Sequence, residues 1–85
     1  MREAILSPAA RAYRDEMSDL ERTAIDRRIA HLEYHPAPDH VTTFAVPGVT
    51  GFLIYDDGEW RMSYAILNEA TILIRSVAHI LDLPS

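Results

Sequence analysis

The stretch 51–79 constrains the fold most strongly, because it reads as three consecutive β-strands. Its first apolar run, 52–55, leads into Asp57-Gly58, which is typical of a tight type I′ hairpin turn because glycine readily adopts a positive φ. The run 60–67 alternates with the two-residue period of a strand, and 71–77 is rich in β-branched residues. We therefore expect three strands that follow one another directly.

The strand register decides which side chains share a face, since a slip of one residue turns a strand over. We expect Leu67 to lie opposite Thr71 and Trp60 opposite Ala78, because the alternative slip places charged side chains in the apolar core. On this register one face is apolar, with Trp60, Met62, Tyr64 and Ile66. The other face collects Arg61, Ser63, Arg75 and His79. For the first strand two alternatives stay open, in which the core side takes either Leu53 and Tyr55 or Phe52 and Ile54.

Two helix starts precede these strands. Ser7-Pro8 places a capping serine before a proline that suits the first helical position, so we expect a helix from there to about Glu16. Ser18 and Glu21 match a capping box, which predicts a second helix over 19–34 that ends before Pro36. The expected core-facing positions are Ala9, Tyr13 and Met17 in the first helix, and Ala24 or Ile25, Ile29 and Leu32 in the second.

Short apolar runs on either side of the helices complete the order of elements. Residues 3–6 form a candidate edge strand, and 42–46 form a further candidate strand that ends at Pro47-Gly48. The order is therefore (β)ααββββ in a single domain, 1–85, of the α+β class. We expect a helical hairpin on one face of an antiparallel sheet. The other face, with Arg61 and Arg75, is then left open.

Composition excludes several kinds of site and partner. The net charge of −5 and the absence of lysine disfavour a general nucleic-acid binder, although Arg61 and Arg75 make the strand face locally positive. The absence of cysteine removes disulfides and thiolate metal sites. His31 and His35 have a spacing that can chelate zinc, but without a clear third ligand we expect no metal and no cofactor. With no membrane-spanning apolar run and no signal-peptide pattern, we expect a cytoplasmic protein without a membrane partner.

Several short patterns occur along nearly the whole chain in the order known from one protein family. They are Ser7-Pro8-Ala9-Ala10, Ile25-Asp26-Arg27 with Leu32 and Pro36, Gly51-Phe52, Trp60-Arg61-x-x-Tyr64 and Ile72-x-Ile74-x-x-Val77-x-His79. On these patterns the chain resembles the RelE/ParE superfamily, the toxins of bacterial type II toxin–antitoxin modules, and its motif spacing is nearest to the RelE/YoeB branch. The resemblance implies a growth-inhibiting toxin with a RelE/ParE-like fold. It also implies a cognate antitoxin whose C-terminal segment wraps the toxin in a hetero-oligomer.

The branches of this superfamily imply different mechanisms. Similarity to RelE and YoeB implies a ribosome-dependent mRNA endonuclease (an mRNA interferase) that acts on the ribosome and mRNA without a metal. In that case Arg61 matches an arginine that stabilises the transition-state phosphate, and His79 matches a C-terminal general acid or base. Similarity to ParE implies a DNA gyrase inhibitor, and a third alternative is a non-toxic antitoxin-binding module. We expect the endoribonuclease as the leading mechanism, because the spacing of Arg61 and His79 favours it, whereas the acidic charge and the absence of lysine favour the other two.

Metal-free RNA cleavage needs a base for the 2′-OH, an acid for the leaving oxygen and fixed positive charge for the phosphate. His79 can act as acid or base near neutral pH, and arginines can bind a phosphate through two hydrogen bonds. The candidate catalytic residues are therefore Arg61, His79 and Arg75. A second acid or base stays open among Glu59, Tyr55, Asp39 and His40.

Overall fold

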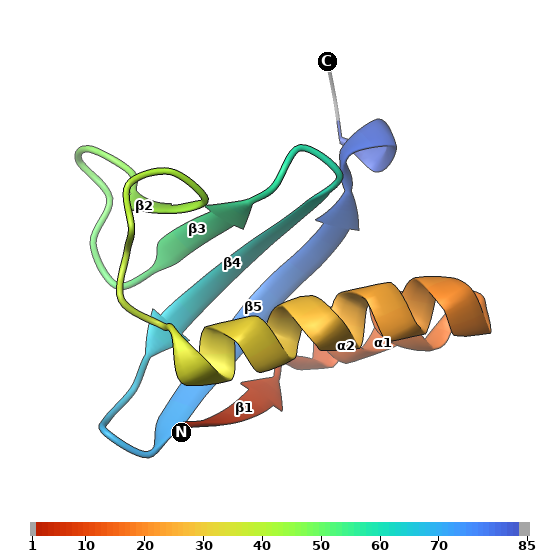
Figure 1. The fold of residues 1–85 in the computed structure, drawn as a ribbon, viewed down its shortest axis with the longest axis horizontal. Helices are drawn as coiled ribbons and strands as arrows, with labels where there is room; N and C mark the ends of the chain where they lie inside the picture. Colours follow the sequence, from red (N-terminus) through yellow and green to blue (C-terminus); the bar gives the residue numbers. More distant parts are fainter. Residues whose placement is uncertain (1, 84–85) are drawn as a thin grey trace.

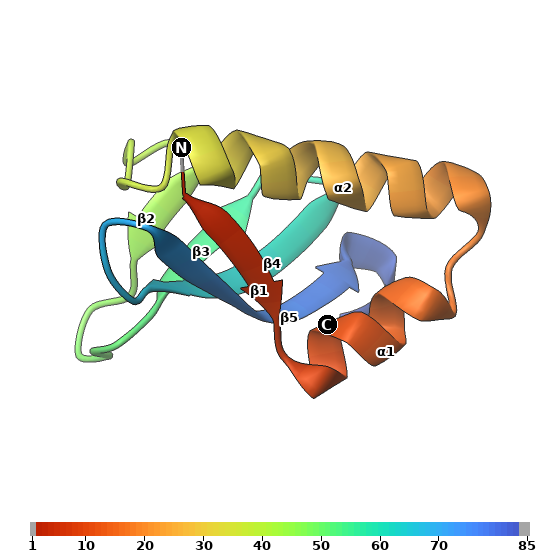
Figure 2. The same ribbon diagram turned by 90° about the horizontal axis from the view of Figure 1, so that it is seen from below.

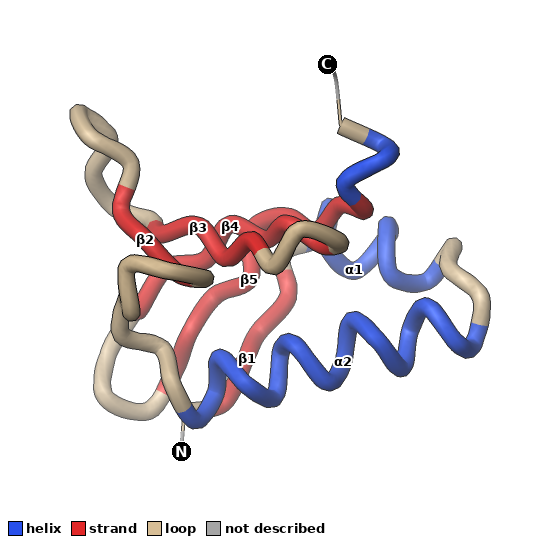
Figure 3. The backbone as a smooth tube through the Cα atoms, turned by 45° about the horizontal axis from the view of Figure 1, so that its top comes forward, coloured by secondary structure: helices blue, strands red, loops and turns tan. Residues whose placement is uncertain are grey.

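A five-stranded mixed sheet with the strand order β1-β5-β4-β3-β2 forms the centre of the fold (Figures 1 and 2). The computed structural model describes residues 2–83. Its elements are β1 (Glu3–Leu6), α1 (Pro8–Asp15), α2 (Asp19–Tyr34), β2 (Thr43–Ala45), β3 (Leu53–Asp56), β4 (Trp60–Ile66), β5 (Thr71–His79) and the 3-10 helix η1 (Ile80–Asp82). Figure 3 shows α1 and α2 on the same side of the sheet, so this α+β fold leaves the other sheet face without a helix over it in the described part of the chain.

The two helices begin at the caps that the sequence predicts. Ser7 Oγ accepts the N–H of Ala10 at 3.1 Å, and Ser18 forms the expected capping box with Glu21. The bounds of α2 are those expected, and α1 ends at Asp15, one residue before the expected end. Within residues 2–83, no helix has both the length and the apolar character needed to cross a membrane.

The first strand is at the edge of the sheet, as expected, but it corrects the prediction of an antiparallel sheet. β1 pairs with β5 in parallel, with Glu3 opposite Thr71 and Leu6 opposite Ile74. A parallel pair needs a long crossover, and the two helices lie in the connection that leads from β1 to the later strands. The other three strand pairs are antiparallel, as expected.

The core lies between the helices and the sheet, and the predicted apolar face of β4 forms its centre. Trp60, Met62 and Tyr64 are at most 2% exposed, and the Tyr64 hydroxyl donates a 2.7 Å hydrogen bond to the Pro36 carbonyl. Ile66, expected on the same face, is 40% exposed, because it borders an open cavity at the end of the strand. The other buried apolar side chains are Ala10, Ile25, Ile29, Leu32, Tyr55, Ile72, Ile74 and Val77.

The structure corrects one expected core position in α1 and decides which side chains of β3 face the core. α1 buries Ala10 rather than Ala9, which is exposed, while Tyr13 and Met17 pack against the core as expected. In β3 the core side takes Leu53 and Tyr55, which decides between the two alternatives left open by the sequence.

The turn between β3 and β4 is not the predicted type I′ turn of Asp57-Gly58. Gly58 has a positive φ of 86°, but Asp57 does not, and a type I′ turn needs positive φ at both central residues. The Asp57 carboxylate instead accepts the N–H groups of Glu59 at 2.9 Å and Trp60 at 2.8 Å. The aspartate side chain therefore moves the turn one residue along, to Gly58 and Glu59.

The same carboxylate connects the turn to α2. Arg28 Nε donates to Asp57 Oδ2 at 2.6 Å, and the Tyr55 hydroxyl donates to the same oxygen at 2.8 Å. Arg28 also donates to Glu59 at 3.2 Å. Burial alone would raise the pKa of Asp57, but the hydrogen bonds from Trp60, Glu59, Tyr55 and Arg28 outweigh burial and hold that pKa at about 2. This network fixes α2 against the end of the sheet.

Replacing the largest core side chain should unfold much of the protein population. We expect Trp60→Ala to lower the free energy of unfolding by about 3–5 kcal/mol, because it removes a buried indole and leaves a cavity. Urea unfolding followed by circular dichroism measures the change, with Leu81→Ala, at an 86% exposed position, as the control. A loss below about 1 kcal/mol for Trp60→Ala would contradict the position of this face in the core.

The Asp57 network predicts a specific loss of stability in acid. Because the folded-state pKa of Asp57 is lowered from 3.8 to about 2, its contribution is complete above about pH 5 and is lost progressively as the pH falls toward 2. We expect Asp57→Asn to lower the free energy of unfolding by about 2 kcal/mol at pH 7. The difference in this free energy between the variant and the parent protein should narrow between pH 4 and pH 2. Unfolding titrations across this range test the prediction, with Glu69→Gln on the exposed β4–β5 turn as control. A difference that is the same at pH 7 and pH 2 would contradict it.

Candidate functional site

A β-bulge interrupts the pairing of β4 with β5, and it decides which side chains reach the open sheet face. The expected register holds where Ile66 faces Ile72 and Tyr64 faces Ile74. The next pair is Ser63 with Ser76, so Arg75 is an extra residue in β5. From that point to the end of the strand, the register differs by one residue from the prediction.

The bulge moves His79 away from the predicted catalytic face. His79 lies opposite Trp60, where the sequence register places Ala78. Its ring meets the buried Trp60 indole edge-to-face, with 4.9 Å between centroids. The prediction that Arg61, Arg75 and His79 share one face is therefore wrong for His79, because the extra residue reverses the direction of the side chains that follow it.

His79 has a structural position at the end of β5. The ring Nδ1 of His79 accepts the backbone N–H of Leu81 at 3.1 Å and so caps η1. The backbone N–H of His79 donates to the Tyr13 hydroxyl at 2.9 Å. The Tyr13 hydroxyl in turn donates to Asp82 at 2.5 Å. Burial and then the bond to Asp82 raise the pKa of Tyr13, so the hydroxyl keeps its proton at neutral pH. These bonds join α1 to the end of the sheet.

The two arginines stay on the open face, each with a partner that the sequence analysis missed. Arg61 donates to Asp56 Oδ2 from Nε at 3.0 Å and from Nη2 at 2.8 Å, while its side chain remains 48% exposed. The Arg75 guanidinium lies over the Phe52 ring, 4.3 Å from its centroid. The first partner depends on the shifted β3–β4 turn, because only a loop at Gly58 and Glu59 places Asp56 opposite Arg61. The second depends on the bulge and had no sequence signal.

Hydroxyl and apolar side chains fill the rest of this face. Ser63 and Ser76 face each other across the two strands, with 2.6 Å between their Oγ atoms. The strand register puts apolar side chains around them, none of which is fully buried: Ile5, Phe44, Ile54, Ala65 and Leu73. We call the two arginines, the two serines, Phe52 and these five residues the open face. It offers two guanidinium groups on an apolar surface.

Three of the four candidates for a second acid or base have bonding partners outside the open face. Glu59 pairs with Arg28, and Tyr55 lies on the core side with its pKa raised to about 12 by burial and by its bond to Asp57. Asp39 accepts the N–H groups of 41–43, and these bonds lower its pKa to about 2. His40 lies in the same loop with a positive φ of 65°.

Comparison with known proteins adds no family assignment. No protein-family model matches the chain, and no curated protein matches it either. What the molecule can do is therefore inferred from the chemistry of the open face, where guanidinium groups can bind carboxylates or phosphates and apolar side chains can bury a partner's surface.

Stability measurements should separate the structural histidine from the exposed arginine. We expect His79→Ala to lower the free energy of unfolding by about 1–2 kcal/mol, because it removes the cap of η1 and the contact with Trp60. Arg61→Ala should cost no more than about 1 kcal/mol, because its ion pair with Asp56 is exposed. Equal losses for both variants in urea unfolding would contradict this division of roles.

Proposed function

We propose that this chain is the cytoplasmic toxin of a type II toxin–antitoxin module and that it inhibits growth through its open face. The single observation that supports this is the pair of arginines, Arg61 and Arg75, on an apolar sheet face with no helix over it in residues 2–83. The element order and the sequence patterns that resemble the RelE/ParE superfamily agree with it.

The chemistry of the open face suits a protein partner. A segment with apolar side chains and carboxylates would bury Ile5, Ile54 and Leu73 and could pair its carboxylates with Arg61 and Arg75. The cognate antitoxin is the partner that the family resemblance implies, and the two chains would form a hetero-oligomer. Because Arg61 already has Asp56 as a partner, an antitoxin carboxylate would compete with an existing ion pair rather than meet a free charge.

The position of His79 favours inhibition by binding over inhibition by RNA cleavage. General acid–base catalysis needs a proton-transfer group within hydrogen-bond reach of the reacting oxygen. His79 lies on the Trp60 side of the sheet, and its Nδ1 already accepts the N–H of Leu81. A ParE-like DNA gyrase inhibitor, which acts by binding a protein, therefore becomes the favoured mechanism.

A ribosome-dependent mRNA endonuclease stays the second candidate, on a specific observation. Arg61 and Arg75 lie on the same face as the hydrogen-bonded hydroxyls of Ser63 and Ser76. Guanidinium and hydroxyl groups together can bind an RNA phosphate. In this candidate the ribosome would have to supply or orient the missing proton-transfer group.

Growth of a bacterial host that expresses the chain tests the toxin proposal. We expect the parent protein to arrest growth, and Arg61→Ala with Arg75→Ala to relieve the arrest by at least tenfold in colony count. Arg27→Ala is the matched control, because it removes one exposed guanidinium from α2, outside the open face. Full toxicity of the double variant would contradict a role for the open face, and a harmless parent protein would leave only the antitoxin-binding module.

Two assays with purified protein then separate the mechanisms. The favoured mechanism predicts that the protein inhibits DNA supercoiling by gyrase and leaves a reporter mRNA intact in a translating extract. Primer extension that finds cuts only during translation, lost in Arg61→Ala but kept in His79→Ala, would instead establish the endonuclease. Cuts that depend on His79 would contradict the structural position assigned to that residue here.

A further inference from the structure

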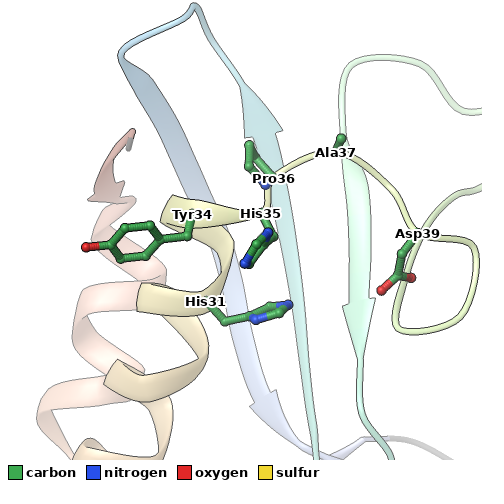
Figure 4. A pocket seen from close by; sticks show the side chains of 6 residues that line it. All are labelled: His31, Tyr34, His35, Pro36, Ala37 and Asp39. Atoms are coloured by element: carbon green, nitrogen blue, oxygen red, sulfur yellow. The ribbon is translucent and has the colours of Figure 1, made fainter.

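A cavity of about 490 Å³ lies at the C-terminal end of α2, and none of its lining residues belongs to the open face (Figure 4). Its lining comes from the last turn of the helix and the loop that follows: His31, Tyr34, His35, Pro36, Ala37 and Asp39. Figure 4 shows the imidazoles of His31 and His35 side by side on the cavity wall, with Asp39 on the opposite side. The Tyr34 ring points away from them.

The two imidazoles are close together and chemically available. They are four residues apart, with His31 in the last turn of α2 and His35 at its C-cap, and their ring centroids are 5.2 Å apart with an interplanar angle of 42°. Both residues are exposed, and among residues 2–83 no hydrogen bond uses a ring nitrogen of either one. His79 differs in this respect, because its Nδ1 is already occupied by the N–H of Leu81.

The separation of the rings fits a shared metal ion. Zinc–nitrogen bonds of about 2.0–2.1 Å place each ring centre about 3.2 Å from the metal, so two imidazoles in a tetrahedral site have centroids about 5 Å apart. The observed 5.2 Å lies at that separation. The distance between the two rings is therefore the one that a shared ion requires.

The charges around the cavity attract a cation. Asp39 accepts three backbone N–H bonds, from Thr43, Val41 and Thr42, and these lower its pKa to about 2, so its carboxylate stays ionised at neutral pH. All three bonds go to Oδ1, and among the described residues no hydrogen bond is made to Oδ2. The C-terminal end of α2 adds the partial negative charge of its last carbonyls.

We propose that His31 and His35 chelate one divalent transition-metal ion, such as Zn²⁺, Ni²⁺ or Cu²⁺. No group of three or more metal-ligating side chains occurs within residues 2–83, so the two imidazoles are the protein ligands. Water completes the coordination, and Asp39 acts on the ion through its charge across the cavity. Imidazole ligands select these ions over Mg²⁺, which prefers oxygen.

Isothermal titration calorimetry with NiCl₂, ZnCl₂ and MgCl₂ tests the proposal on the purified protein. We expect one Ni²⁺ or Zn²⁺ per chain and no measurable Mg²⁺ binding. His31→Ala and His35→Ala should each weaken binding at least tenfold. Alanine is well tolerated at the helical position 31, and circular dichroism confirms the folding of both variants. Asp39→Asn should weaken binding by a smaller factor.

His40→Asn is the matched control, because it removes an exposed histidine that lies in the neighbouring loop but outside the pair, and asparagine tolerates the positive φ of this position. We expect its affinity to equal that of the parent protein. The proposal is overturned if neither His31→Ala nor His35→Ala weakens binding, or if His40→Asn weakens it as much as they do. Absence of any Ni²⁺ or Zn²⁺ binding by the parent protein would also overturn it.

Discussion

The extra residue in β5 determines which side chains the sheet presents on each face. Before Arg75, β5 pairs with β4 in the register that the sequence predicts, and Ile72 and Ile74 face the core. After it, Val77 takes the core position opposite Met62, and His79 packs on Trp60. A continuous ladder would have put His79 beside the arginines, whereas the bulge leaves Arg75 on the open face and sends the histidine to the other side. The chemistry available on each face follows from this one irregularity.

Much of the fold could be predicted because its signals are local. The caps at Ser7 and Ser18 fix both helix starts, and alternation along β4 identifies its buried face. The bulge could not be read from the sequence, because uninterrupted alternation already keeps Arg75 and His79 out of the core, and no glycine or turn residue marks the extra position. The parallel pairing of β1 depends on contacts between distant segments, and the β3–β4 turn depends on a side chain, Asp57, that replaces backbone acceptors.

The arrangement separates the parts of the molecule that maintain the fold from those that are free to bind. Arg28 and Asp57 hold α2 against the β3–β4 turn at the end of the sheet, and the bonds of Tyr13 hold α1 and η1 against the end of β5. Neither network uses Arg61 or Arg75. Strand alternation in the sequence therefore predicted that both arginines lie on the open face. Their partners Asp56 and Phe52, and the position of His79 on the opposite face, became apparent only from the three-dimensional register.

The central claim is that the bulge places His79 against Trp60 and away from Arg61. A nuclear Overhauser spectrum of the isotope-labelled protein tests this most directly, because it reports proton pairs within about 5 Å and the Trp60 and His79 ring centroids are 4.9 Å apart. The structure predicts cross-peaks between the His79 ring protons and the Trp60 indole, and none between His79 and the Arg61 side chain. Cross-peaks from His79 to Arg61, with none to Trp60, would restore the continuous register and contradict the structure described here.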